Sequence, residues 1–168
     1  MSQKMLENLK KELKEAVSKH YEYLKKSFTE ETLYGYSLYT SEDVPDLYPV
    51  ANKLSAIEVD KADAEYCYYR YCPNEWSDWD DFGMFSEVNE IITELYQEMN
   101  DDFLGYKKGV LRQAMQALLE LESEGLFGEK NDERFLIVFL SDSANDIMNI
   151  SAKELNTSNV YEEFTSIL

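Results

Sequence analysis

Residues 84–99 carry the pattern that most constrains the fold, because they separate into an apolar face and an acidic face. Apolar side chains recur there at spacings of three and four, which predicts a helix with one side in the core: Phe85, Val88, Ile92, Leu95 and Met99. Four glutamates fall within about 80° of one another at about 100° per residue, well away from that stripe. These four, called the acidic ridge below, are Glu87, Glu90, Glu94 and Glu98. We expect them to face solvent.

The acidic ridge has no compensating charge in the sequence around it. From Tyr71 to Tyr106 the chain has ten Asp or Glu residues and no Lys or Arg. Like charges four residues apart on a helix cost roughly 0.2–0.5 kcal/mol each, and Glu94 has such a neighbour on both sides. The ridge is therefore either a solvated face that the fold tolerates or a docking face for a basic partner.

Three aspartates and two tryptophans precede this helix and are candidates for the same contact. Asp78, Asp80 and Asp81 would extend the negative charge of the ridge. Trp76 and Trp79 would anchor a partner, because tryptophan is enriched at binding hot spots. The alternative is that both tryptophans are buried and close one end of the core.

Composition limits the classes of partner. The chain has 168 residues, 44% of them hydrophobic and 30% charged, which is typical of one folded domain with a core of its own. Its net charge of -18 would repel nucleic acid and anionic membranes, so we expect it to bind neither. A basic protein partner fits that charge, although acidity that serves solubility alone fits it equally well.

Residues 2–28 predict one long amphipathic helix, whose apolar residues recur at spacings of three and four. Its charged start is typical of neither a signal peptide nor an anchor, and no later segment has the roughly 18 apolar residues that a membrane span needs. Cys67 and Cys72 lie five residues apart, which matches no zinc or redox motif, so we expect free thiols and a cytoplasmic location. His20, the only histidine, lies beside the apolar stripe without an identifiable catalytic partner.

Residues 33–168 predict an α+β body, within a single domain of residues 1–168. Strands are expected where β-branched and aromatic residues dominate, at residues 33–40, 65–71 and 134–140. The last of these is apolar on both faces, which favours a position near the middle of an antiparallel sheet of three or four strands. Residues 41–49 contain two prolines and are expected to be loop, and residues 51–64 favour a short helix over a strand.

Three further helices complete the predicted fold. Residues 103–124 have a helical apolar pattern, and Gly125 suits a Schellman stop. Residues 144–155 predict a helix whose N-cap lies among residues 141–143. Residues 160–168 predict a last short helix.

Motifs of known catalytic or cofactor sites are absent. The sequence has no P-loop, dinucleotide-binding, nucleophile-elbow, zinc-protease or kinase motif. Asp78, Asp80 and Gly83 fit three positions of a calcium loop, but Phe82 and Asn89 stand where a ligand and a bidentate glutamate are needed. We therefore expect neither a metal nor a cofactor.

Five segments in order carry a resemblance to a known family: YGYSLYT, YYRYCPNEW, LESEGLFG, FLIVFLSDS and NVYEEF. In this order, from Leu33 to Phe164, the chain resembles an uncharacterised bacterial family, the domain of unknown function 4303. Proteins of this kind are similar to the small acidic immunity proteins that are encoded beside bacterial polymorphic toxins. The resemblance implies a cytoplasmic protein that neutralises a toxin, and its motifs mark no catalytic residue.

Three functions therefore stand as expectations. The first is an immunity-type protein that binds and occludes a basic partner, such as a toxin nuclease, through the acidic ridge, the three aspartates and the two tryptophans. The second is a small-ligand binder or enzyme with an aromatic pocket that gathers Tyr36, Tyr69 and Arg70. The third is a homodimeric adaptor that uses exposed aromatic side chains.

Overall fold

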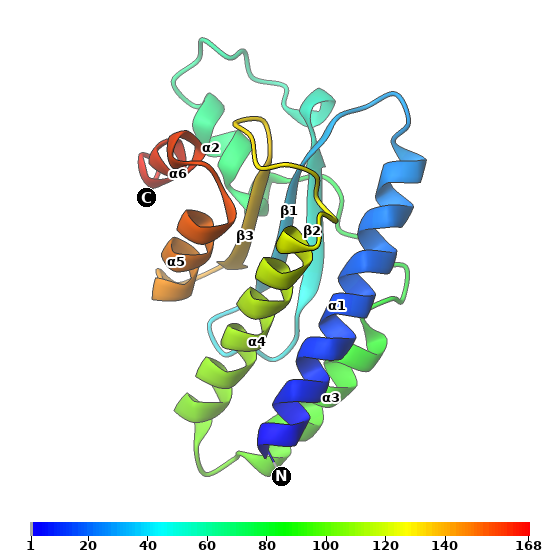
Figure 1. The fold of residues 1–168 in the computed structure, drawn as a ribbon. Coiled ribbons are helices and arrows are strands. Elements are labelled where there is room, and N and C mark those ends of the chain that lie inside the picture. The colour runs from blue at the N-terminus through cyan, green and yellow to red at the C-terminus, as the bar shows by residue number, and fades with distance from the viewer. Residues whose placement is uncertain (1) are drawn as a thin grey trace.

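A three-stranded mixed sheet lies at the centre of this α+β fold, and helices cover both of its faces (Figure 1). The computed structural model describes residues 2–168. Its strands are β1 (Leu33–Thr40), β2 (Tyr48–Lys53) and β3 (Phe135–Leu140). Its α-helices are α1 (Ser2–Ser27), α2 (Tyr66–Tyr71), α3 (Ser86–Glu98), α4 (Phe103–Ser123), α5 (Asp146–Leu155) and α6 (Ser158–Thr165). Single 3-10 turns occur at Leu54–Ala56 and Pro73–Glu75.

The central strand is β1, so the prediction that residues 134–140 lie in the middle of the sheet was wrong. The strand order is β2-β1-β3. β1 pairs antiparallel with β2, with Tyr36 opposite Ala51. It pairs parallel with β3, with Ser37 opposite Ile137. The sheet is therefore mixed, where an antiparallel sheet was predicted.

All residues of β3 are buried although it is an edge strand. Its free edge is covered by α5 and by Asn156, which follows that helix. The Leu136 amide donates to Asn156 Oδ1 at 2.9 Å, and the Val138 amide donates to Ser151 Oγ at 3.1 Å. Asn156 Nδ2 donates in return to the Leu136 carbonyl at 2.7 Å. These side chains satisfy the backbone groups that a further strand would pair. A helix-covered edge strand thus has the same apolar sequence as a central one.

Two local predictions in the middle of the chain were also wrong. Residues 48–53 form β2, where a loop and a short helix were expected; Pro49 is tolerated because β2 lies at the edge of the sheet. Residues 66–71 form α2, where a strand was expected. Tyr71 packs edge-on against Phe135 at 4.9 Å between ring centroids. Strand preference of aromatic residues reflects packing on a sheet, and here tertiary packing on β3 overrides it.

The elements with strong helical periodicity formed where they were predicted. α1, α3 and α4 match the predicted helices, and β1 matches its predicted residues. Gly125 has a φ of 88° and ends α4 in a Schellman motif, in which the Leu126 amide donates to the Leu121 carbonyl at 3.1 Å. The N-cap of α5 is Asn145, which lies beyond the predicted residues 141–143 and accepts from the Ile147 amide at 3.0 Å.

α1 lies across one face of the sheet and packs against both α3 and α4 (Figure 1). Tyr36 of β1 extends into this layer and meets Tyr21 of α1 edge-on, with ring centroids 5.5 Å apart. On the opposite face, Trp76 packs against Phe135 of β3. α1 is therefore the helix against which α3 packs most extensively, and Asn89 ties α3 to the backbone of Leu47 as well. Among residues 2–168, no helix has both the length and the apolar character to span a membrane.

Candidate functional site

The acidic ridge faces solvent, as its helical spacing predicts. The opposite side of α3 is buried through Val88, Ile92 and Leu95. All four ridge glutamates are exposed. In the described part of the chain, residues 2–168, no Lys, Arg or His nitrogen lies within 4.0 Å of a ridge carboxylate. The ridge is therefore a row of negative charges on a firmly packed helix.

Trp76 belongs to the core, so it does not serve as a surface anchor. Its side chain is 3% exposed, and its Nε1 donates to the Arg70 carbonyl at 3.1 Å. The ring lies so close to β1 that a Cβ on Gly35 would be 2.8 Å from it. Trp76 thus fills the space that Gly35 leaves open, and its candidacy as a partner contact is corrected.

Trp79 is the tryptophan that a partner can reach. It is 41% exposed, and its Nε1 donates to the Trp76 carbonyl at 2.7 Å. Its ring stands edge-on to Tyr39, with centroids 4.8 Å apart. Trp79 is therefore held in one orientation at the surface.

The three aspartates after Trp76 have distinct environments. Asp78 pairs through its backbone with Ala51 on the outer side of β2 and so covers part of that edge of the sheet. Asp80 is exposed, and its Oδ1 accepts from the Phe82 amide at 2.8 Å. Asp81 Oδ1 accepts from the Gly83 amide at 3.0 Å, and its Oδ2 accepts from Phe85 just before α3. Asp78 and Asp80 each keep one carboxylate oxygen that accepts no hydrogen bond within residues 2–168, whereas both oxygens of Asp81 shape the turn into α3.

The side chain of His20 links the loop at residues 77–82 to α1. It is fully buried between the Tyr36 hydroxyl, at 3.0 Å from Nδ1, and the Asp80 carbonyl, at 2.9 Å from Nε2. A carbonyl only accepts, so Nε2 carries the proton and Nδ1 accepts from Tyr36. Burial lowers the pKa of His20 below its usual value, against the opposing effect of its bond to Asp80. His20 is therefore a neutral structural residue.

A groove between the end of α1 and the loop at residues 77–82 brings several candidates together. We call it the aromatic groove, and its volume is about 360 Å³. Its lining consists of Tyr23, Leu24, Ser27, Phe28, Ser77, Asp78, Trp79, Asp80 and Phe82. Sequence reasoning missed Tyr23 and Phe82. An aromatic residue that stands off the apolar stripe of the first helix is the signal that could have identified Tyr23.

The aromatic pocket expected from sequence does not form around its three residues. Tyr36 is fully buried and engaged with His20. Arg70 is buried, with its guanidinium over the Tyr34 ring at 4.8 Å. Tyr69 lines a separate cavity of about 290 Å³ together with Asn52 and other residues. The three side chains therefore occupy different environments.

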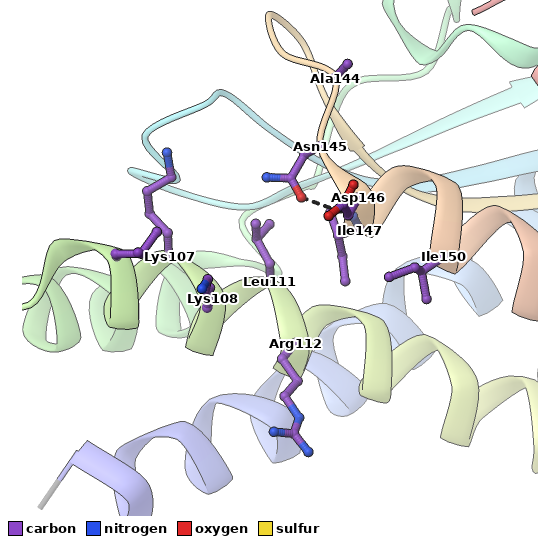
Figure 2. Close-up of a pocket in the computed structure, with 10 residues that line it drawn as sticks. Lys107, Lys108, Leu111, Arg112, Ala144, Asn145, Asp146, Ile147 and Ile150 are labelled. Atoms are coloured by element: carbon purple, nitrogen blue, oxygen red, sulfur yellow. Dashed lines mark hydrogen bonds between the residues drawn. The ribbon is translucent and has the colours of Figure 1, made fainter.

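A larger cavity of about 410 Å³ lies between α4 and α5. Figure 2 shows Leu111, Ile147 and Ile150 around it, with Lys107 and Lys108 on the α4 side. The Arg112 side chain extends away from Ile147 and Ile150, towards α1 (Figure 2). The basic side chains that line this cavity therefore do not converge on one point. Among residues 2–168, no group of three or more His, Cys, Asp or Glu side chains could hold a metal ion.

Comparison with known proteins identifies a family. The family model for Domain of unknown function (DUF4303) matches residues 13–157. Neither a curated protein nor a solved structure matches the chain.

Proposed function

We propose that this chain, which belongs to the DUF4303 family, is an immunity-type protein that neutralises a basic protein partner through its acidic ridge and Trp79. The setting we propose is the bacterial cytoplasm, and the partner is a toxin domain such as a nuclease. A nuclease must present Lys and Arg side chains to nucleic acid phosphates. A protein that covers those side chains with carboxylates would block access of the substrate.

The unpaired state of the acidic ridge is the observation that supports this proposal. Some glutamates elsewhere in the chain pair with cations, for example Glu22 with Lys25 at 2.9 Å and Glu124 with Lys14 at 2.6 Å, and the unpaired ones on α5 and α6 do not form a row of four on one helix. The four ridge glutamates have no such partner in residues 2–168, although α3 packs directly on the lysine-rich α1. Repulsion along the ridge is thus left uncompensated, and a basic partner would relieve it.

The arrangement divides binding into two physical roles. The ridge charges would accelerate encounter with a positive surface, and this effect would weaken as salt is added. Trp79 would slow dissociation, because burial of a rigid, half-exposed indole removes apolar surface from water. Capture is thus predicted to depend on salt through its association rate and on Trp79 through its dissociation rate.

The test compares two variants with the same change in net charge. In the ridge variant, Glu87, Glu90, Glu94 and Glu98 are all replaced by Lys. In the control variant, four exposed glutamates elsewhere are replaced by Lys: Glu58, Glu129, Glu154 and Glu162. Both variants and the wild type are immobilised, exposed to lysate of the source bacterium, and the retained proteins are identified by mass spectrometry and produced in pure form for affinity measurements.

We expect the wild type and the control variant to retain the same basic protein, and the ridge variant to bind it at least about 100-fold more weakly, which corresponds to about 2.7 kcal/mol. Circular dichroism should show the same helix content in all three proteins, because every substituted side chain is exposed. Equal losses of affinity in both variants would mean that net charge alone, and not the position of the ridge, determines binding. Unchanged binding in the ridge variant would remove the ridge from the function.

A further inference from the structure

The aromatic groove gathers three exposed aromatic side chains from two distant segments. Tyr23 of α1 is 43% exposed, Trp79 is 41% exposed, and Phe82 is 47% exposed. Exposed large apolar side chains are ordinary when they are scattered over a surface. Here all three line one hollow of about 360 Å³. Their faces are therefore available to a group that enters the groove.

Contacts within the chain hold the rings in position. Tyr23 and Phe82 contact each other, with centroids 4.5 Å apart. The Trp79 indole is fixed by its bond to the Trp76 carbonyl and by the Tyr39 ring. The backbone that presents Phe82 is tied to α1 through His20 and Asp80. Because this surface is preformed, ligand binding would carry only a small entropic cost of ordering these side chains.

Two carboxylates at the groove keep an oxygen free. Asp78 Oδ2 accepts from Ser77 Oγ at 2.7 Å, and Asp80 Oδ1 accepts from the Phe82 amide at 2.8 Å. Within residues 2–168, Asp78 Oδ1 and Asp80 Oδ2 accept no hydrogen bond and neither residue is in an ion pair. Each aspartate can therefore accept from one further donor.

A cation already lies over one ring of the groove wall. Lys53 Nζ is 4.5 Å from the centroid of the Phe28 ring, while it pairs with Glu31 at 3.0 Å. Phe28 lines the aromatic groove and Lys53 does not, so this contact shows a cation on one ring of the wall rather than inside the groove. Aromatic faces attract cations because the ring quadrupole is negative there. The groove thus combines ring faces with free carboxylate oxygens, and both favour positive charge.

We propose that the aromatic groove binds one arginine side chain of the basic partner, with the guanidinium against Trp79 and its N–H groups donating to Asp78 and Asp80. This assignment rests on the proposed function, since it names the anchor by which the same partner is held. Arginine fits better than lysine because its guanidinium is planar, stacks on aromatic rings and carries five donors. The compact ammonium group of lysine could contact either a ring face or a carboxylate, but not both at once.

The test uses N-acetyl-arginine methylamide as the probe and the full chain as the protein. The indole N–H signal of Trp79 is followed by NMR during titration, and the signal of buried Trp76 serves as the internal reference. The citrulline analogue is the matched control, because it has nearly the same shape as arginine and no charge. The lysine analogue tests the preference for a planar cation.

We expect a saturable shift of the Trp79 signal with the arginine probe at millimolar concentration, with binding of the citrulline and lysine probes about tenfold weaker. The variant that combines Asp78→Asn with Asp80→Asn should lose binding by a similar factor. It keeps the Oδ1 acceptor for the Phe82 amide, and an unchanged Trp76 signal shows that it is folded. If that signal moves, the single variant Asp78→Asn takes its place, since Asp78 Oδ2 only accepts from Ser77 Oγ.

The ridge variant separates this inference from the proposed function. It should bind the arginine probe as the wild type does, because the ridge does not line the groove. The absence of a saturable shift, or equal shifts with arginine and citrulline, overturns the groove assignment and leaves the role of the ridge intact. If the probe binds but the ridge variant captures the partner as strongly as the wild type does, the proposed role of the ridge is overturned instead.

Discussion

Two helix surfaces of this acidic chain treat their carboxylates in opposite ways. Where α1 meets α4, Lys10 Nζ lies 2.6 Å from Glu120, and Lys14 Nζ lies 2.9 Å from Glu120 and 2.6 Å from Glu124. We call these four residues the α1–α4 seam. On α3, which packs on another side of α1, the acidic ridge has no cation within 4.0 Å among residues 2–168.

The difference shows that composition alone does not leave the ridge unpaired. Both surfaces are near α1, which carries lysines along much of its length. Of these two surfaces, only the seam has glutamates turned towards those lysines, whereas the ridge is turned to solvent. The carboxylates of the seam are paired within the fold, and those of the ridge are not. Two substitutions test this distinction directly, and a third tests the link that positions the loop before α3.

The largest effect is expected from His20→Gln, which cuts the link between α1 and the loop that leads to α3. The substitution removes the fixed geometry that joins Tyr36 and the Asp80 carbonyl, and it leaves one or both buried groups without a partner. We expect a loss of about 1–3 kcal/mol in the free energy of unfolding, measured with urea. A loss below the error of the measurement would show that the link is dispensable.

The same variant has a predicted pH signature. Burial holds the pKa of His20 below its usual value, so the unfolded chain binds a proton more readily than the folded one. Wild-type stability should therefore fall as the pH drops below about 6.5, the usual histidine pKa. His20→Gln should remove that part of the decline. The carboxylates titrate at lower pH in both proteins, so the difference between the two curves isolates His20.

The second effect is expected from Glu120→Gln in the seam. The substitution removes both ion pairs of a residue whose side chain is 40% exposed, so each pair contributes little. We expect a loss of about 0.5–1 kcal/mol in unfolding free energy at low salt, and less as salt screens the pairs. The lysines lower the pKa of Glu120, so the loss should be present above the usual glutamate pKa and should vanish as the pH falls through the lowered value.

The smallest effect is expected from Glu94→Gln in the ridge, and its sign is opposite. This change relieves two like-charge contacts, with Glu90 and with Glu98, and removes no ion pair. We expect a gain of about 0.5 kcal/mol in unfolding free energy at low salt, which also declines with salt. Glu120→Gln and Glu94→Gln change the net charge equally, so each is the control for the other. Two changes of the same sign would mean that the surfaces do not differ.

Local patterns accounted for the long helices and for the ridge. The apolar stripes of α1, α3 and α4 can be read directly from spacing, because each helix buries one continuous face. The outward direction of Glu87 to Glu98 follows from the same spacing. β2 and α2 were not predictable in this way, since both are short and their state depends on contacts with β1 and β3.

The sequence by itself therefore determined that an acidic row stands outward on a packed helix, because helical periodicity is a property of neighbouring residues. The tertiary structure alone decided which carboxylates have cations, since Lys10 and Glu120 meet only when α1 packs on α4. It also decided that Trp76 is buried while Trp79 is exposed, and that Tyr23 joins Trp79 in one groove. Those facts depend on contacts between distant segments, and no spacing within a single segment encodes them.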